Sequence, residues 1–444
     1  MRAKRQGITS DRNTLLFVGI SLLSGFGSAL MLLAAGVWVL ELTGSSSLAA
    51  LAGLFLFVPT LAGPALGAIV DRLPRRRLII WTHLVTAATV LSLLAVRAEA
   101  QVWLIYAVML GYGVSFVLVD AGEAALLPAA LPPDALGNVN GLRVSAQEGV
   151  KLVAPLVGAG LFTWWGGHSV AVVTAGTLAV AAALYPLVRI RPPGPGTTPE
   201  PRAATAEPEA AGRSTGRIRE GIRFLWSLPE LRITVLIGSL TIAMSGLTTA
   251  AVYAVIIEDL HRPATFVGVL ASAQGAGSLL GGLIVGRLLR TRGALAVGAL
   301  GAVLFAVGTV ARCIPWWPAA IGCSVLVGLG LPWTLVAAMT AIQTRTPEAL
   351  LGRVSATAST LLFAPVAVAT PVGAALILLD RRLPLLLAAA LCLGAALLAV
   401  RPGPADRERN RLDGDRPDQP GRRSEPAVRE TAVGSSQSAG GAGA

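Results

Sequence analysis

The hydrophobic positions of this 444-residue chain gather in long runs, separated by short stretches of polar, basic or turn-forming residues. An apolar run of about 20 residues can cross the hydrocarbon core of a bilayer as an α-helix. The pattern therefore predicts an all-α membrane protein with twelve transmembrane helices. The predicted spans are 14–40, 47–70, 77–96, 102–127, 142–164, 169–187, 231–257, 264–288, 294–312, 319–342, 354–378 and 384–400.

The composition narrows the class of protein. Hydrophobic residues make up 54% of the chain and charged residues only 14%, whereas soluble domains carry about 25% charged residues. This balance excludes a soluble enzyme, a secreted disulfide scaffold and a fibrous protein. The three cysteines and three histidines lie apart, without metal-ligand spacing, and there is no Walker loop or nucleophile elbow. We expect no metal, no cofactor and no enzymatic activity.

Basic residues gather in alternate loops of the predicted topology. The net charge is +12, but nearly all basic residues lie between the apolar runs or in the C-terminal tail. Lys and Arg accumulate on the cytoplasmic side of membrane proteins, so we expect a multi-pass protein of the cell membrane with both termini cytoplasmic. Its partners would be the lipid bilayer and a small molecule, and not a nucleic acid. The first apolar run is expected to be retained as a span rather than cleaved as a signal peptide.

The chain repeats itself at a separation of about 215 positions. The segment 57–77 (FVPTLAGPALGAIVDRLPRRR) matches 271–292 (ASAQGAGSLLGGLIVGRLLRTR), and 132–146 matches 346–358. Such parallel halves are a transporter architecture. Residues 190–216 are rich in Pro, Ala, Gly and Glu, as linkers are, and the tail holds almost no large apolar residue. We therefore expect a cytoplasmic N-terminus (1–13), a six-helix bundle (14–189), a cytoplasmic linker (190–230), a second six-helix bundle (231–400) and a disordered cytoplasmic tail (401–444).

The segment 67–77 (GAIVDRLPRRR) resembles the signature loop between the second and third helices of the major facilitator superfamily. It lies at the matching boundary between spans, and a degenerate copy stands at the same place in the second half. Pro74 replaces the family's usual Gly. The resemblance implies two pseudo-symmetric six-helix bundles and secondary active transport by alternating access.

More narrowly, the chain resembles the twelve-span drug:proton antiporters that include macrolide and siderophore exporters. The resemblance covers about residues 14–400 and rests on LTGSS (42–46) after the first span, Pro59 in the second and GNVNGL (137–142) before the fifth. Ser28 stands where many relatives carry Asp. The resemblance implies a bacterial membrane protein that exports small amphipathic compounds, drugs among them, by proton antiport. We expect it to act as a monomer.

The signature loop supplies a candidate conformational latch. Arginine is a permanent cation that pairs with carboxylates and helix-end carbonyls, and small residues let helices approach closely. We expect Asp71 to hold the outward-facing state through a neighbouring helix end and the arginines. The alternative is that the arginines only set the topology. The latch residues are Gly67, Asp71, Arg72, Arg75, Arg76 and Arg77.

Four ionisable residues inside the predicted spans form a candidate proton-coupling group. Asp120 and Glu123 lie in the fourth span, and Glu148 and Lys151 in the fifth. If the fifth span begins near 142, all four residues lie at one depth. Glu148 and Lys151 would then lie about 9 and 13 Å from the cytoplasmic end of that span. Charges in hydrocarbon are costly unless they pair and face a cavity. We expect Lys151 to neutralise one carboxylate and leave another to carry a proton; the alternative is a static ion-pair cluster.

Aromatic and amide side chains inside the spans are candidates for contact with the cargo. A drug-like ligand needs an apolar, aromatic cavity with a few polar groups, and ordinary packing is the alternative at each position. The candidates are Tyr106, Tyr112, Phe116, Gln147, Tyr253, Gln274, Trp333 and Phe363. Prolines remove backbone hydrogen bonds inside helices, so Pro155, Pro365 and Pro371 are predicted to let the fifth and eleventh helices bend.

Two other functions are compatible with the same pattern. An uptake symporter would need a polar or charged site at the midplane, and the second half carries almost no charge within its spans. A scaffold or receptor that transports nothing would need neither the buried charges nor the helix-bending prolines. The sequence therefore favours an exporter of apolar or amphipathic cargo.

Overall fold

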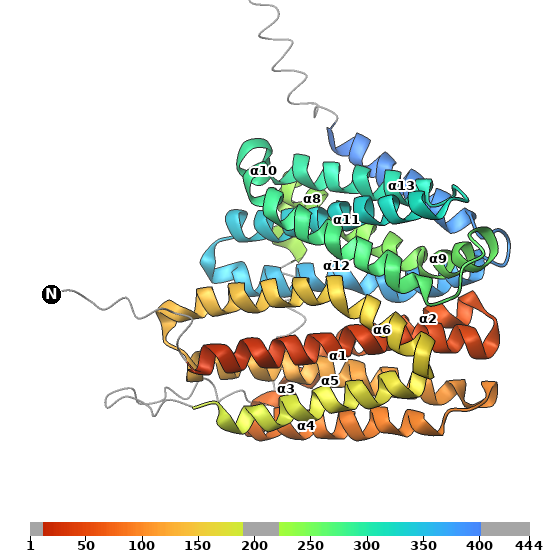
Figure 1. Cartoon of the computed structure of the whole chain (residues 1–444). Helices are drawn as coiled ribbons and strands as arrows, with labels where there is room; N and C mark the ends of the chain where they lie inside the picture. Colours follow the sequence, from red (N-terminus) through yellow and green to blue (C-terminus); the bar gives the residue numbers. More distant parts are fainter. Residues whose placement is uncertain (1–11, 190–221, 401–444) are drawn as a thin grey trace, which may run out of the picture. The chain divides into compact units, whose positions relative to one another are not determined.

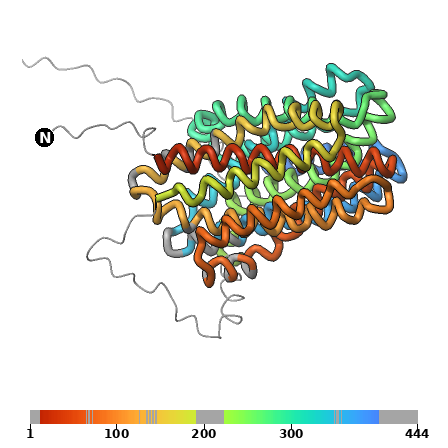
Figure 2. The backbone as a smooth tube through the Cα atoms, turned by 60° about the horizontal axis from the view of Figure 1, so that its bottom comes forward, coloured from red at the N-terminus to blue at the C-terminus, as the bar shows by residue number. Residues whose placement is uncertain are grey.

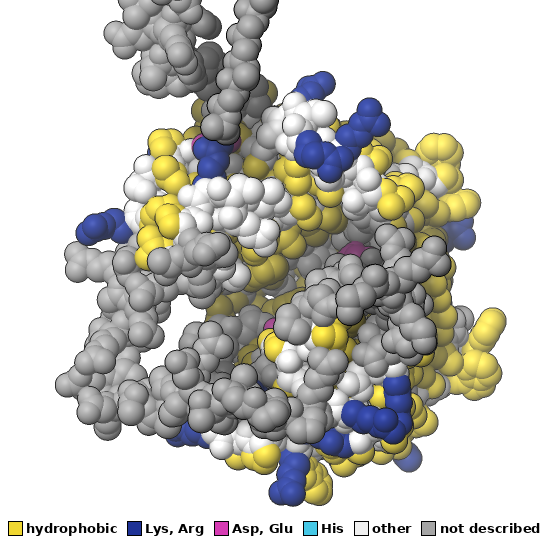
Figure 3. Space-filling model, turned by 90° about the vertical axis from the view of Figure 1, so that its left-hand side faces the viewer, with side chains coloured by type: hydrophobic (Ala, Val, Ile, Leu, Met, Phe, Trp, Pro, Cys, Tyr) yellow, Lys and Arg dark blue, Asp and Glu magenta, His cyan; other side chains and the backbone are white. Residues whose placement is uncertain are grey.

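The computed structural model describes residues 12–189 and 222–400, and every regular element in this part of the chain is helical. The helices run side by side between two ends (Figures 1 and 2). We call the end at which α1 begins the basic end, because arginine side chains stand around it (Figure 3). The other end is called the opposite end.

The first half of the chain consists of α1 (Arg12–Thr43), α2 (Ser46–Phe57), η2 (Val58–Ala62), α3 (Gly63–Arg72), α4 (Arg75–Leu91), η3 (Ser92–Ala95), η4 (Glu99–Gln101), α5 (Val102–Ala130), α6 (Pro133–Leu184) and η5 (Tyr185–Leu187). The second half consists of α8 (Pro229–Leu247), α9 (Thr249–Ala254), the π-helical turn η6 (Val255–Asp259), α10 (Phe266–Ala311), α11 (Trp317–Arg345), α12 (Glu348–Leu376) and α13 (Leu383–Val400).

Two of the long helices each contain two spans. The backbone of α6 turns at Gly166 (φ 71°) and that of α10 at Gly293 (φ 78°), in a region that glycine adopts without steric cost. Within residues 12–189 and 222–400, eight helices are long and apolar enough to cross a bilayer. Two shorter apolar helices, Ser46–Ala62 and Leu383–Ala399, complete the twelve spans once α6 and α10 are divided. The predicted all-α fold of two six-helix bundles is confirmed.

One predicted boundary differs in a way that matters for the site. The fifth span was expected to begin near 142, whereas α6 begins at Pro133. Proline suits the first turn of a helix, because its missing N–H would have no partner there. Residues 133–141 are polar and glycine-rich, so hydropathy alone places the start too late. The earlier start moves every later residue of this helix deeper from the basic end.

The two halves repeat specific contacts as well as sequence. Gly113 of α5 lies against the backbone carbonyl oxygen of Leu56, and Gly328 of α11 lies in the same way against that of Gln274. Near the basic end, Asn13 donates from Nδ2 to the Ala130 carbonyl oxygen (2.9 Å), and Arg345 binds Glu230 (Nη2–Oε2, 2.6 Å) at the equivalent helix pair. The sequence repeat is therefore a repeat of helix packing.

The halves meet toward the opposite end. Tyr253 of α9 packs against Gly36 of α1, and the Ser47 hydroxyl donates to the Ala374 carbonyl oxygen (2.6 Å). Ala50, Ala250 and Ala374 form one buried cluster across the same interface.

The first half of α6 also packs on the first half of α10. Gly268 lies against the carbonyl oxygen of Pro155, and Gly275 lies against that of Lys151. Small residues at these crossings let the helix backbones touch. The ion pairs described below for the basic end, in contrast, lie within one half.

Candidate functional site: charged groups inside the helix bundles

A buried polar network crosses the first half near the basic end. Arg143 of α6 forms an ion pair with Glu123 of α5, and its Nε donates to the Ser21 hydroxyl of α1 (2.7 Å). The Tyr185 hydroxyl donates to the other carboxylate oxygen of Glu123 (2.5 Å). Glu123 is only 8% exposed. A carboxylate so enclosed requires partners of this kind, because burying an unpaired charge is costly.

The network continues through His83 of α4. Its Nδ1 lies 3.0 Å from the Ile79 carbonyl oxygen, so Nδ1–H donates and Nε2 is left to accept from the Ser24 hydroxyl (3.2 Å). The His83 ring also packs beside Tyr185, with ring centres 5.5 Å apart. The network therefore joins α1, α4, α5, α6 and η5. His83 is only 2% exposed, so both ring nitrogens find their partners inside the protein.

Asp120 lies one helical turn from Glu123 and opens onto a cavity. The cavity has a volume of about 270 Å³ and is lined by Asp120, Glu123, Ala124, Leu127, Pro128, Leu136 and Arg143. Asp120 is exposed, in contrast to Glu123. The group thus contains two carboxylates and one guanidinium, and one added proton makes it neutral.

The other two predicted coupling residues form a separate pair. Lys151 Nζ binds Glu148 Oε1 at 2.6 Å, one turn apart on α6. Lys151 thus pairs with one carboxylate, as expected, but the four residues do not lie at one depth, because the early start of α6 places Glu148 and Lys151 deeper. At 1.5 Å per residue, Glu148 and Lys151 lie about 22 and 27 Å from the start of α6. Glu123 and Asp120 lie only about 10 and 15 Å from the end of α5, which is at the same side of the bundle. The cation that pairs with a carboxylate of the fourth span is Arg143, which is not among the four residues predicted from the sequence.

The signature loop lies at the basic end, between α3 and α4. Arg76 donates to the carbonyl oxygen of Pro186, in the turn that ends the sixth span. Helix ends carry unpaired carbonyls and a partial negative charge, which favours a cation there. Arg72, Arg75 and Arg77 are exposed. The environments of Gly67 and of the Asp71 side chain lie outside the described structure, so the latch stays a prediction.

Half of the candidate cargo residues are enclosed by protein. The Tyr112 hydroxyl lies 3.2 Å from that of Ser28, Tyr106 donates to the Leu48 carbonyl oxygen (2.9 Å), and Trp333 Nε1 donates to the Gly281 carbonyl oxygen (3.0 Å). Tyr253 is buried against α1. These contacts hold helices together, as the packing alternative expects.

The remaining candidates differ in accessibility. Phe116 (54% exposed), Phe363 (45% exposed) and Gln147 are accessible, and Gln274 is half-buried. The helices run on through Pro155, Pro365 and Pro371, and bending there stays a prediction.

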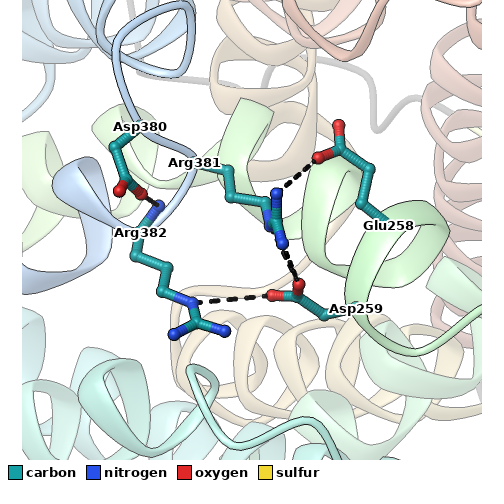
Figure 4. A network of polar contacts seen from close by, with 5 residues as sticks. All are labelled: Glu258, Asp259, Asp380, Arg381 and Arg382. Atoms are coloured by element: carbon teal, nitrogen blue, oxygen red, sulfur yellow. Dashed lines mark hydrogen bonds and ion pairs between the residues drawn. The ribbon is translucent and has the colours of Figure 1, made fainter.

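A charged network at the opposite end went unrecognised in the sequence. Arg381, between α12 and α13, binds Asp259 (Nη2–Oδ1, 2.5 Å) and Glu258 (Nη1–Oε2, 2.9 Å) at the end of the seventh span (Figure 4). Arg382 lies 3.9 Å from the other oxygen of Asp259. The hydrogen bond to Asp259, together with its charge, raises the pKa of the Arg381 guanidinium. The available signal was an acidic pair and a basic pair in loops on the same side.

No group of three or more His, Cys, Asp or Glu side chains within the described ranges is placed to hold a metal ion. The polar arrangements described above are ion pairs and hydrogen bonds, which join different segments except for the Glu148–Lys151 pair within α6. They can hold, release or exchange protons and charged ligands.

Comparison with known proteins places the chain in a family. The model of the Major Facilitator Superfamily matches residues 15–253 and again 233–434. Macrolide efflux protein A of Streptococcus pyogenes is 24% identical over 262 residues, which are 58% of this chain and 62% of that protein. The matched region thus spans about three-fifths of that relative. Enterobactin exporter EntS of Escherichia coli is 27% identical over 317 residues, 69% of this chain and 70% of the exporter.

Solved structures show the same fold at lower identity. A bacterial homologue of the iron transporter ferroportin, in an inward-facing state, superposes with a TM-score of 0.62 at 15% identity and covers 88% of this chain and 99% of its own. The nucleoside transporter NupG superposes with a TM-score of 0.66 at 12% identity, covering 88% and 98%. Together with the twelve spans and the repeated halves, these matches establish that the chain belongs to the major facilitator superfamily of membrane transporters.

Proposed function

We propose that this transporter exports small amphipathic compounds, such as drugs, antibiotics or siderophore-like molecules, in exchange for protons. Export is supported by the names of the relatives, which are a macrolide efflux protein and an enterobactin exporter. An amphipathic cargo is supported by the second half, whose spans carry almost no charge. Exposed aromatic and amide side chains, those of Phe116, Phe363 and Gln147, could contact such a cargo.

The observation that carries the proton step is the excess of carboxylates beside Arg143. Asp120 and Glu123 share one guanidinium at the wall of a cavity, inside an otherwise apolar bundle. One proton neutralises the group, and its loss restores a net negative charge. Because Arg143 of α6 also binds Ser21 of α1, a change in its pairing with Glu123 of α5 would affect the contacts of all three helices. A proton at this site could therefore bias the packing of the first half.

The proposal includes an orientation and a state. The basic end faces the cytoplasm, because arginines concentrate there, and both termini are proposed to lie on the cytoplasmic side. The halves touch toward the opposite end, so the described arrangement corresponds to an inward-facing state. The signature loop, with Asp71 and its arginines, acts as the latch of the outward-facing state. The protein works as a monomer in the bacterial cytoplasmic membrane.

The experiment uses purified protein in liposomes that contain a trapped pH-sensitive dye. An acidic lumen should drive uptake of a radiolabelled macrolide, beyond the passive uptake of protein-free liposomes with the same gradient, while the luminal pH rises faster than in those liposomes. A protonophore added beforehand should abolish both signals. Uptake driven instead by an alkaline lumen would indicate symport, and uptake that ignores the gradient would exclude proton coupling.

A further inference from the structure

Lys151 is unusual in the composition of this chain. Of its 36 Lys and Arg residues, 34 are Arg and only two are Lys, at positions 4 and 151. Lys151 is the one lysine in residues 12–189 and 222–400. A lysine ammonium is a compact, rotatable donor on a flexible stem, whereas a guanidinium is a planar fork that binds carboxylates in pairs. A lysine in a chain that otherwise uses arginine indicates that this position needs a cation that can change partners.

The position of Lys151 on its helix is fixed by its neighbours. Gly275 of α10 lies against the Lys151 carbonyl oxygen, and Gly268 lies against that of Pro155. Residues 148, 151 and 155 share one face of a helix, since they are three and four positions apart. The large exposed apolar side chains of this segment, Val153 and Leu156, lie on another face. Glu148 and Lys151 therefore lie toward the second half, where the two halves meet, and away from the lipid-facing side.

The ion pair leaves the ammonium available to a further ligand. The Lys151 side chain is 57% exposed and that of Glu148 is 32% exposed. The bond to Glu148 uses one of the three N–H groups of the ammonium. The facing segment of α10, residues 266–286, contains no charged residue. An acidic group that enters between the halves thus meets a cation that is bound on one side only, and no carboxylate opposes it from α10.

We propose that Lys151 binds an acidic oxygen group of the cargo, such as a carboxylate, a catecholate or a hydroxamate, and that Glu148 holds the ammonium when no cargo is present. Among amphipathic compounds, an acid should then bind more tightly than an amine. A cationic cargo would have to displace Lys151 from Glu148, and Lys151 is tethered one turn away and repels it. This inference rests on the proposed transport function and names the chemical class of its substrate.

The test compares two dyes that differ in one group. Rhodamine 110 carries a free carboxylate, and rhodamine 123 is its methyl ester. Binding to the purified full-length protein is measured by fluorescence polarisation without any gradient. Wild type should bind rhodamine 110 more tightly by about tenfold or more, the contribution of a charge-assisted hydrogen bond. Lys151→Met should lose this preference, and Lys151→Arg should weaken it, because a guanidinium stays paired with the Glu148 carboxylate. Glu148→Gln, which removes the competing carboxylate, should strengthen rhodamine 110 binding.

Arg290→Met serves as the matched control, because it removes an exposed cation at the basic end and should leave the preference unchanged. Equal binding of the two dyes to wild type, including no binding of either, would overturn the inference. So would a preference that survives in Lys151→Met. Because no proton gradient is used, failure here is distinct from failure of proton coupling, which the macrolide experiment measures separately.

Discussion

Gly113 and Gly328, 215 positions apart, make the same contact in the two halves: each lies against a backbone carbonyl oxygen of a neighbouring helix. A side chain at either position would overlap that oxygen, which belongs to Leu56 in the first half and to Gln274 in the second. Backbone cannot move aside as a flexible side chain can. The two glycines therefore fix how closely the second and fourth helices, and the eighth and tenth, can pack.

Substitution of either glycine should destabilise the protein. We expect Gly113→Ala and Gly328→Ala each to lower the free energy of unfolding by about 1–3 kcal/mol, the usual cost of overpacking. Gly111→Ala and Gly322→Ala are matched controls on the same two helices, because a Cβ there meets ordinary contact or open space. Thermal unfolding in detergent distinguishes them. Equal melting temperatures for all four variants would show that the helices adjust freely.

The network at the opposite end should tie the seventh span to the loop before the twelfth. Arg381→Gln leaves the carboxylate of Asp259, whose side chain is only 5% exposed, without its nearest cation. We expect a lower melting temperature than wild type and a smaller decrease for Arg382→Gln, whose contact is longer at 3.9 Å. Adding Asp259→Asn to Arg381→Gln should recover part of the loss. If both single variants melted at the same temperature as wild type, the network would contribute little to stability.

The signature loop is tested by removing one charge. Asp71→Asn keeps the size of the side chain but not its charge, and a charged contact contributes about 1.5–3 kcal/mol, enough to shift the ratio of two conformations tenfold or more. We expect normal membrane insertion and strongly reduced turnover, measured as cargo efflux from cells. Arg290→Gln, an exposed cation in the repeated segment, is the control. Wild-type turnover in Asp71→Asn would leave the arginines with a topological role alone.

The proposed orientation can be checked by labelling. Single cysteines at Ser45 and Ser214, in a variant without the three native cysteines, should react with a membrane-impermeant maleimide from opposite sides of the membrane. Ser45 follows the first span, and Ser214 belongs to the linker between the halves. Labelling of both from outside intact cells would contradict the orientation with both termini inside.

The fold could be predicted from the sequence because hydropathy and charge act over whole helices. Twelve apolar runs, the repeat of 57–77 and the distribution of arginines leave one architecture, and the structure has it. The start of a helix is harder to predict from the sequence, because polar first turns such as those of residues 133–141 do not raise the local hydropathy. That single boundary displaced Glu148 and Lys151 by more than two helical turns from the predicted start of their helix.

The sequence predicts which residues could belong to the candidate site, but not which of them contact one another. The sequence identifies which residues are ionisable within the spans, but the partner of each depends on depth and on helix rotation. Arg143 and Tyr185, which bind Glu123, lie 20 and 62 positions away from it in the chain. Tyr106 and Trp333 likewise fit an aromatic cavity by type, yet their polar atoms bind backbone carbonyls of neighbouring helices. Contacts of this kind between helices leave no periodic pattern in the sequence.

We propose that a proton held by Asp120 and Glu123, beside Arg143, drives export. The decisive measurement uses liposomes with an acidic lumen that contain either Glu123→Gln or Asp120→Asn. Their macrolide uptake is compared with that of the same liposomes without a gradient and of protein-free liposomes. Glu230→Gln, which removes a carboxylate paired with Arg345 in the second half, is the control. We predict that Glu123→Gln and Asp120→Asn still bind the macrolide but accumulate no more of it than protein-free liposomes with the same gradient, whereas Glu230→Gln behaves as wild type. Full gradient-driven uptake by both Glu123→Gln and Asp120→Asn would contradict the account and leave this cluster with a structural role.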